Sequence, residues 1–270
     1  SSKTLTLLTD SVINSYANAG AGANIAINGP VEGTTAGVQA LSLKAKGGTI
    51  SMVGSIGATT RVGALTLGDS VQTGAVTVNG AINAQSLTVG EDGGVNSFAI
   101  TLYNVGTSGT PAAGTTTITN AANFYNVGTI QLGDYSTDVF NFLGGLSVAN
   151  ASAVTVKAQS LNATASPLYI NVPTRFTYST TLSPTTGQIT LGSVIIDDGR
   201  TLTLGSGAAT PMTLASISGV ASGVPSNIIF NTTAAVTVSG AIGTDIGDFT
   251  ITNSGGITFN GAVGATGDRI

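Results

Sequence analysis

Short apolar strands recur along the whole chain in two alternating forms. One form has apolar residues at its first, third and seventh positions and glycine at its fifth, as in Ile25–Val31, Ile50–Ile56, Val76–Ile82 and, late in the chain, Ile257–Val263. The other is a plain alternation of apolar and polar residues, as in Leu41–Leu43. An alternation of period two predicts a β-strand with one buried face.

Like elements return every 21 to 26 residues, which is the spacing of Leu41, Leu65 and Leu87. A fixed period of this kind, built from strands, indicates a solenoid in which each repeat is one coil stacked on the last. We therefore expect an all-β, right-handed parallel β-helix (β-solenoid) of about twelve coils of roughly 22 residues. The three leucines should stack in one ladder, and the rod should be on the order of 55–60 Å long.

The sequence predicts that the whole chain, 1–270, forms one continuous β-solenoid. Ten of its fourteen aromatic residues lie between 98 and 178, so we expect 98–180 to form wider, less regular coils. The most literal repeat lies there, because Tyr103–Thr107 returns unchanged as Tyr125–Thr129. With a coil of about 22 residues, Tyr103 and Tyr125 should stack directly on each other.

Composition narrows the possible partners. Charged residues make up only 7% of the chain, with a net charge of −4, so no basic patch for nucleic acid is expected. Cysteine is absent, which excludes disulfides and cysteine-based metal sites. No apolar run approaches the ~20 residues of a membrane span, so this segment should not insert into a membrane. The chain opens on Ser1–Thr4 without a signal-peptide pattern, which is the expectation for a processed chain or a piece of a longer one.

Catalytic chemistry has few candidates, because histidine and cysteine are both missing. The densest charged cluster, Asp197–Arg200, reads as an ordinary polar turn, and Glu91–Gly94 reads the same way. We expect no catalytic residues, no metal site and no cofactor. The alternative is a carbohydrate-active β-helix enzyme, and a single calcium ion at a loop stays open.

Threonine pairs of the form Thr-x-Thr raise the possibility of ice binding. They begin at Thr4, Thr115, Thr201 and Thr250, and these positions do not keep one period. We interpret them as outward-facing strand residues.

Aromatic side chains are the one feature that suggests ligand contact, since exposed rings can stack on sugars. Tyr103 and Tyr125 are the best candidates for a passive glycan-binding module, because polar residues follow each. The alternative is that the aromatic residues fill the interior of the coils.

Two stretches, Gly48–Thr59 and Gly256–Thr266, resemble the repeats of filamentous-haemagglutinin-like and autotransporter-type bacterial surface proteins. The resemblance covers most of the chain and is weakest at 98–230. It implies a right-handed β-helix on or outside a Gram-negative cell, serving as an adhesin stalk, filament or surface coat. The expected function is therefore non-enzymatic, structural or adhesive, with a glycan or a cell surface of the host or environment as a possible partner.

The two ends of the sequence complement each other. The late copy of the repeat stops just before its next strand, and Thr4–Asp10 has the sequence of that strand. Neither end carries the charged or proline-rich cap that blocks edge-to-edge pairing. This predicts tandem copies or head-to-tail self-association, which does not close and so gives a filament. The expected interface residues are Leu5, Leu7, Ile257, Phe259 and Ile270.

Overall fold

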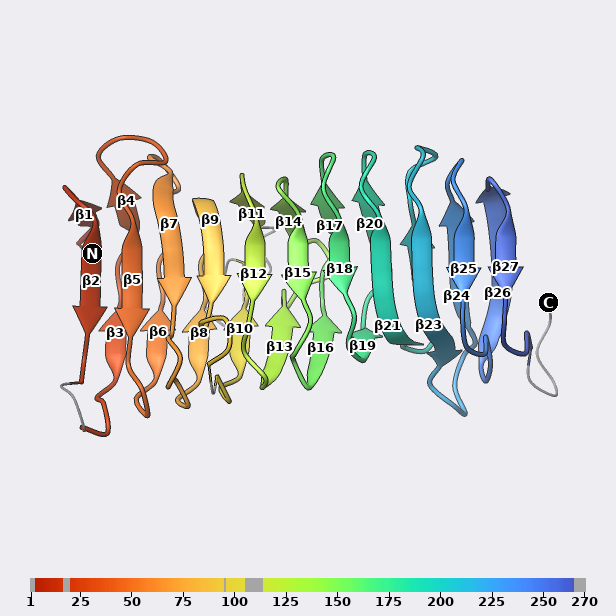
Figure 1. Ribbon diagram of the computed structural model, residues 1–270, viewed down its shortest axis with the longest axis horizontal. Helices are drawn as coiled ribbons and strands as arrows, with labels where there is room; N and C mark the ends of the chain where they lie inside the picture. The colour runs from red at the N-terminus through yellow and green to blue at the C-terminus, as the bar shows by residue number, and fades with distance from the viewer. Residues whose placement is uncertain (1–2, 17–19, 95, 105–113, 265–270) are drawn as a thin grey trace.

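The computed structural model is a parallel β-solenoid whose coils follow one another along a single long axis (Figure 1). Its strand pairings form three parallel ladders, which define three faces. It describes residues 3–16, 20–94, 96–104 and 114–264. The predicted all-β parallel solenoid is confirmed, with about ten turns of about 24 residues in place of the twelve shorter coils expected. At 4.7–4.9 Å per coil, ten coils span about 48 Å. The rod is therefore shorter than the sequence suggested.

Each coil passes through three faces in the order face 1, face 2, face 3, and contributes a strand or an isolated bridge to each. Face 1 contains β1 (Leu5–Leu7), β4 (Val31–Gly33), the start of β9 (Asn83–Val89), β11 (Thr115–Ile118), β14 (Val139–Phe142), β17 (Ser160–Ala163), β20 (Thr180–Pro184), β22 (Thr201–Leu204), β24 (Ser226–Asn231) and β26 (Ile246–Asn253). Isolated bridges through Ile56 and Ile82 continue this face from β4.

Face 2 contains β2 (Ser11–Asn14), β5 (Leu41–Lys44), β7 (Val62–Leu67), the end of β9, β12 (Ala122–Phe124), β15 (Leu146–Val148), β18 (Leu168–Ile170), the starts of β21 (Ile189–Ile196) and β23 (Met212–Gly219), β25 (Val236–Val238) and β27 (Ile257–Phe259). Face 3 contains β3 (Ile25–Ile27), β6 (Ile50–Met52), β8 (Val76–Val78), β10 (Ile100–Leu102), β13 (Thr129–Leu132), β16 (Ala153–Val156), β19 (Thr174–Phe176) and the ends of β21 and β23.

The core is a set of ladders of like side chains. Leu41 pairs with Leu65, and Leu65 pairs with Leu87, as the sequence predicted. All three are fully buried. Because a parallel register repeats at every coil, an inward residue meets an inward residue above and below it, and each coil covers its neighbour's apolar surface.

Phenylalanine and tyrosine differ in burial everywhere except in the last described coil, where Phe249 and Phe259 are partly buried. Every described tyrosine is half-exposed, in keeping with a phenol group that needs a polar partner when buried. The fully buried phenylalanines are Phe98, Phe124, Phe140, Phe142, Phe176 and Phe230. Strand pairing runs through 98–180 without a register shift among the described strands there; the shift at β24–β26 lies outside it. The aromatic interior is thus accommodated without a break in strand register, while the coil that joins Leu87 to its partner Ala122 is 35 residues long.

Coil corners are sealed by polar side chains and glycines. Gln72 is buried at one corner, where its Oε1 accepts a hydrogen bond from the Ala45 amide (3.0 Å) and its Nε2 donates to the Gly48 carbonyl (2.9 Å). At another corner a Cβ on Gly54 would lie 2.5 Å from the carbonyl carbon of Gly29 in the coil below. The close approach of coils at the corners therefore depends on side chains that hydrogen-bond to backbone groups and on glycines that leave room for the neighbouring backbone.

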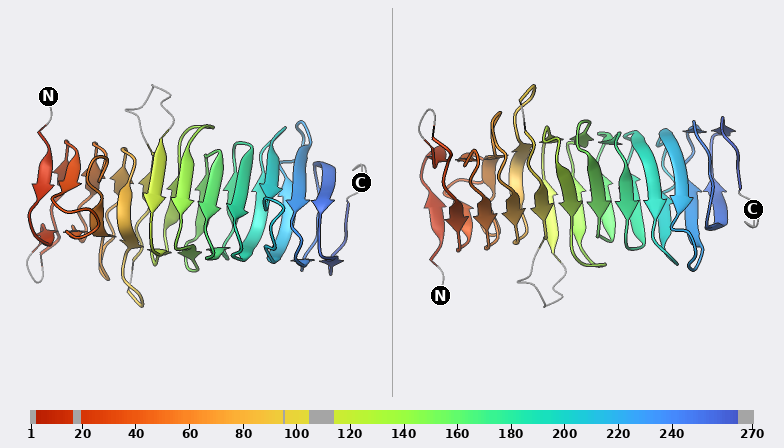
Figure 2. Two further views of the ribbon diagram at one scale, coloured as in Figure 1. Left: turned by 90° about the horizontal axis from the view of Figure 1, so that it is seen from above. Right: turned by 90° about the horizontal axis from the view of Figure 1, so that it is seen from below.

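The two ends of the rod are far apart, with β1, β2 and β3 at one end and β26 and β27 at the other (Figures 1 and 2). Between them the strands follow chain order along the axis. This arrangement separates the molecule into three long outer faces and two end surfaces, which differ in what they offer a partner.

Candidate functional site: the open ends of the solenoid

The N-terminal end of the rod presents three strands with one free edge each. Among the described strands, β1 pairs only with β4, β2 only with β5 and β3 only with β6. Inward apolar side chains are partly uncovered at this end, with Leu5 37% and Ile13 36% exposed. Free backbone edges beside exposed apolar side chains form a template for another strand.

The C-terminal end presents the matching surface. Within the described residues, β26 pairs only with β24, β27 only with β25, and Val263 bridges only to Ile242. Ile251 is 47% exposed, and Phe249 is only partly buried against the core. Ring contacts from Phe230 to Phe249 (5.4 Å between centroids) and from Phe249 to Phe259 (5.5 Å) extend the aromatic packing to this end.

The two ends match face by face. Face 1 starts with β1 and ends with β26, face 2 starts with β2 and ends with β27, and face 3 starts with β3 and ends at Val263. A second copy shifted along the rod axis would bring free edges of the same face together. Opposite charges also lie at the face 1 ends, because exposed Lys3 precedes β1 and exposed Asp248 lies on β26.

The residues predicted for this interface have different positions. Leu5 is exposed at the N-terminal edge, and Ile257 and Phe259 are partly buried on the last strand of face 2. Leu7 is only 2% exposed, because it packs inward on the core of its own coil, so it is not available at the surface. Ile270 lies outside the described residues.

The sequence prediction missed other inward apolar residues at these ends, namely Ile13, Phe249 and Ile251. All three belong to strands whose period-two alternation is visible in the sequence. Alternation alone does not tell which strand is the last of its face, so it could not mark them as end residues.

Tyr103 and Tyr125 do not stack on each other, which corrects the prediction from their identical surroundings. The Tyr103 amide donates to Val78 (2.8 Å) at the end of face 3, whereas the Tyr125 amide donates to Val89 (2.8 Å) at the end of face 2. The two tyrosines therefore lie at different corners. The shared element is the following asparagine, since Asn104 and Asn126 are both buried at their corners.

The charged cluster at 197–200 forms a turn. The Arg200 amide donates to the Asp197 carbonyl (3.0 Å), and Gly199 has φ +65°. The Asp197 carboxylate accepts from Arg175 Nε (2.6 Å) and forms an exposed ion pair with it. The segment from Glu91 is also a turn, closed by the Gly94 amide donating to the Glu91 carbonyl (3.1 Å). Both clusters have the geometry that the sequence predicted for polar turns.

The four threonine pairs all fall on face 1, in β1, β11, β22 and β26. Their spacing in the sequence did not reveal this common face. Other residues interrupt the series, however, because Thr6 pairs with Glu32 and Thr117 pairs with Asn141. Face 1 therefore carries no continuous array of threonine pairs over its described strands.

Two carboxyl groups meet at the corner after β13. Asp138 is fully buried, and its Oδ2 accepts from the Asp134 and Tyr135 amides (3.0 Å each). Burial raises the pKa of Asp138, while burial and the nearby Asp138 carboxylate raise the pKa of Asp134 to about 6. Because backbone amides occupy the Asp138 oxygens, this pair serves to hold the corner.

Within the part of the chain that is described, no three carboxylates gather as metal ligands would. A helix of membrane-spanning length and apolar character is also not found among these residues. Comparison of the chain with protein-family models, curated proteins and solved structures found no match.

Proposed function

We propose that this chain is a non-enzymatic, extracellular structural or adhesive rod, extended by coil-on-coil contact between the C-terminal end of one copy and the N-terminal end of the next. The copies are separate chains or repeats of a giant surface protein. One observation carries the proposal. Over the described residues, β1, β2 and β3 at one end, and β26, β27 and the bridge at Val263 at the other, are paired on one side only, and they fall on the same three faces in the same order.

The energetic argument rests on what the contact would bury. Apolar side chains at both ends are partly exposed, including Leu5, Ile251 and Phe259. Burial of apolar surface stabilises a contact by roughly 25 cal/mol per Å². The same contact pairs backbone groups that otherwise remain at a free edge. A contact of this kind continues the ladders of the rod and requires no new fold.

The direction of the contact follows from the parallel registers. The registers of face 1 lead from Leu5 through Val31 to Ile251, so Ile251 of one copy beside Leu5 of the next continues an inward ladder. Asp248 then lies within one residue of Lys3. Because this contact is head to tail, it leaves a free end at each step and generates a filament.

The location outside the cell is supported by composition and by resemblance. The chain has 7% charged residues and no cysteine, so its export requires no disulfide chemistry. Its coil sequences resemble filamentous-haemagglutinin-like and autotransporter-type repeats of Gram-negative surface proteins. A stiff rod whose outer faces are mostly small and polar suits a stalk or surface filament.

The direct test is assembly of the purified full chain, followed by electron microscopy and sedimentation over increasing concentration. We expect unbranched fibres with an axial repeat of about 53 Å, because the strands of face 2 give ten steps of about 4.8 Å within a copy and the contact with the next copy adds one more. Ile251→Asp should abolish the fibres, because it places a charge in the contact. Val224→Asp is the matched control, since Val224 is 66% exposed in a turn on the side of the rod, and this variant should still form fibres.

An exchange of the charges at Lys3 and Asp248 tests the same end-to-end contact. Lys3→Glu and Asp248→Lys should each weaken assembly, and the double variant should restore it. Wild-type chains that stay monomeric at every concentration would contradict the proposal. So would loss of fibres in Val224→Asp that matches the loss in Ile251→Asp.

A further inference from the structure

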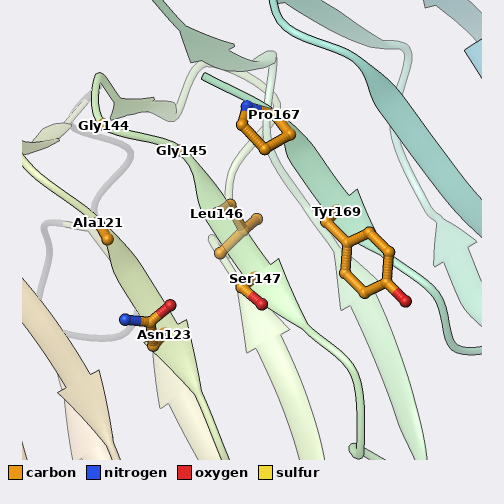
Figure 3. A pocket seen from close by; sticks show the side chains of 8 residues that line it. All are labelled: Ala121, Asn123, Gly144, Gly145, Leu146, Ser147, Pro167 and Tyr169. Carbon is orange, nitrogen blue, oxygen red and sulfur yellow. The ribbon is translucent and has the colours of Figure 1, made fainter.

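A shallow depression of about 440 Å³ lies on face 2, over β12, β15 and β18. Figure 3 shows Asn123, Ser147 and Tyr169 side by side on these three strands, with Pro167 and two glycines at the upper rim. This depression plays no part in the end-to-end contact, since it lies midway along the rod.

The register of face 2 explains why these side chains line up. Asn123 pairs with Ser147, and Ser147 pairs with Tyr169, so the three occupy the same outward position in successive coils. Adjacent strands are about 4.8 Å apart, which places an amide, a hydroxyl and a phenol ring in one row.

The depression exists because of the corner before β15. Gly145 has φ +97°, and the following amide of Leu146 donates to the Pro167 carbonyl (3.0 Å). With no side chain at Gly144 or Gly145, the corner leaves an open space. Pro167 bounds this space on one side.

The residues that line the depression indicate which kind of ligand would fit it. None of the residues that line the depression is charged, so a neutral ligand fits best. The lining is mostly apolar, and a flat ring beside a few polar groups matches a pyranose, which has apolar C–H faces and hydroxyl edges. A peptide strand is disfavoured, because strand addition needs a free sheet edge and these strands are paired on both sides.

The row continues beyond the depression. The outward position after Tyr169 is occupied in each following coil by a threonine, in the order Thr190, Thr213, Thr237 and Thr258. An extended ligand that lies along the rod would therefore meet one hydroxyl about every 4.8 Å.

We infer that face 2 binds a neutral oligosaccharide, with one sugar ring on Tyr169 and its hydroxyls on Asn123 and Ser147. The site is distinct from the pair that the sequence suggested. Tyr103 and Tyr125 lie at two other corners, whereas Tyr169 stands in the middle of a strand and beside the depression.

The test uses the full chain on an array of neutral and acidic oligosaccharides, followed by calorimetry with the neutral oligosaccharide that binds. Cellotetraose, xylotetraose and mannotetraose are suitable neutral probes, and tetragalacturonate is the acidic one. Tyr169→Ala should weaken binding by about tenfold, or 1.4 kcal/mol. Tyr169→Phe should keep it within about twofold, because the ring is retained.

Two further variants test whether the oligosaccharide occupies this depression. Ala121→Leu should also weaken binding, since Ala121 is exposed at the rim and leucine there would fill the depression without touching the core. Tyr103→Ala should leave binding unchanged. Binding of no saccharide, binding of tetragalacturonate alone, or equal binding by wild type and Tyr169→Ala would overturn the inference. Fibre formation should persist in Tyr169→Ala, which separates this test from that of assembly.

Discussion

Two neighbouring strands of face 2, β25 and β27, share one sequence pattern but differ in burial. In β25, Val236 and Val238 are fully buried, whereas in β27 the corresponding Ile257 and Phe259 are only partly buried. The residues of β27 are larger and at least as apolar. The difference arises because β25 has a coil on each side and β27, among the described coils, has one on one side only.

The N-terminal end shows the same contrast. Leu5 in β1 is 37% exposed, while its partner Val31 in β4 is completely buried. The exposed fraction of an inward residue in this fold thus depends on whether a coil lies on both sides of it. Such a rod behaves as a one-dimensional series in which each coil is stabilised by nearest neighbours. An end coil has a neighbour on one side only and therefore lacks about half of that stabilisation. A further coil placed there would add more stability than one placed elsewhere.

The largest expected difference between interior and end coils concerns leucine truncation. Leu65→Ala should lower the free energy of unfolding by about 2–5 kcal/mol, because it opens a cavity between Leu41 and Leu87. Leu5→Ala should cost under about 1 kcal/mol in the isolated chain, since Leu5 is partly solvated already. Urea unfolding followed by circular dichroism measures both. Equal losses would show that stability does not depend on neighbouring coils.

A smaller difference is expected for glycine at the corners. A Cβ on Gly54 would lie 2.5 Å from the backbone of Gly29, whereas a Cβ on Gly243, in the coil next to the end, would have no atom within 4 Å. Gly54→Ala should therefore destabilise the protein by about 1–3 kcal/mol through overpacking. Gly243→Ala should stay within about 0.5 kcal/mol of wild type. Thermal melting of the two variants measures this difference. A larger loss of stability in Gly243→Ala than in Gly54→Ala would contradict the prediction.

The smallest expected effect is a pH dependence that belongs to an interior corner. The pKa of Asp134 is raised from 3.8 to about 6 by burial and by Asp138. A carboxyl whose pKa is raised on folding contributes stability that is present below about pH 4 and is lost as the pH rises through about 6. The advantage of wild type over Asp134→Asn in free energy of unfolding should therefore shrink as the pH increases over this window.

Carbon-13 NMR of the Asp134 carboxyl group measures the same property directly, with an expected midpoint near pH 6. A midpoint near 3.8, or a stability difference that grows with pH, would contradict the assignment. Either result would mean that the neighbouring coils do not desolvate this corner.

Strand content and inward positions could be predicted from local pattern. Leu41, Leu65 and Leu87 were expected in one ladder, and they form it, because alternation fixes the inward side and the period fixes the partner. The turns at 197–200 and from Glu91 were equally readable, since glycine and aspartate favour turns through local backbone geometry. The number of coils was overestimated, because corner lengths vary and the mean coil is about 24 residues.

Which face a residue occupies could be decided only by the tertiary structure. Tyr103 and Tyr125 are 22 residues apart in identical surroundings, yet they lie at the ends of different faces. The connections between strands differ in length, since β10 ends at Leu102 and β11 begins only at Thr115. The 22 residues from Tyr103 to Tyr125 therefore cover less than a full turn, and a count of residues cannot identify the face. The same ambiguity hid the row of Asn123, Ser147 and Tyr169 and the common face of the threonine pairs.

Local sequence pattern was enough to predict that the chain forms parallel stacked strands, which apolar residues point inward, and where glycines and polar residues turn the corners. These properties depend on a few adjacent residues and on one repeated step. The structure alone decided that Leu7 is buried while Phe259 is only partly so, and that the free edges at the two ends match face by face. Those properties depend on which coil lies above or below a residue, and that relation joins segments that are about 24 residues apart.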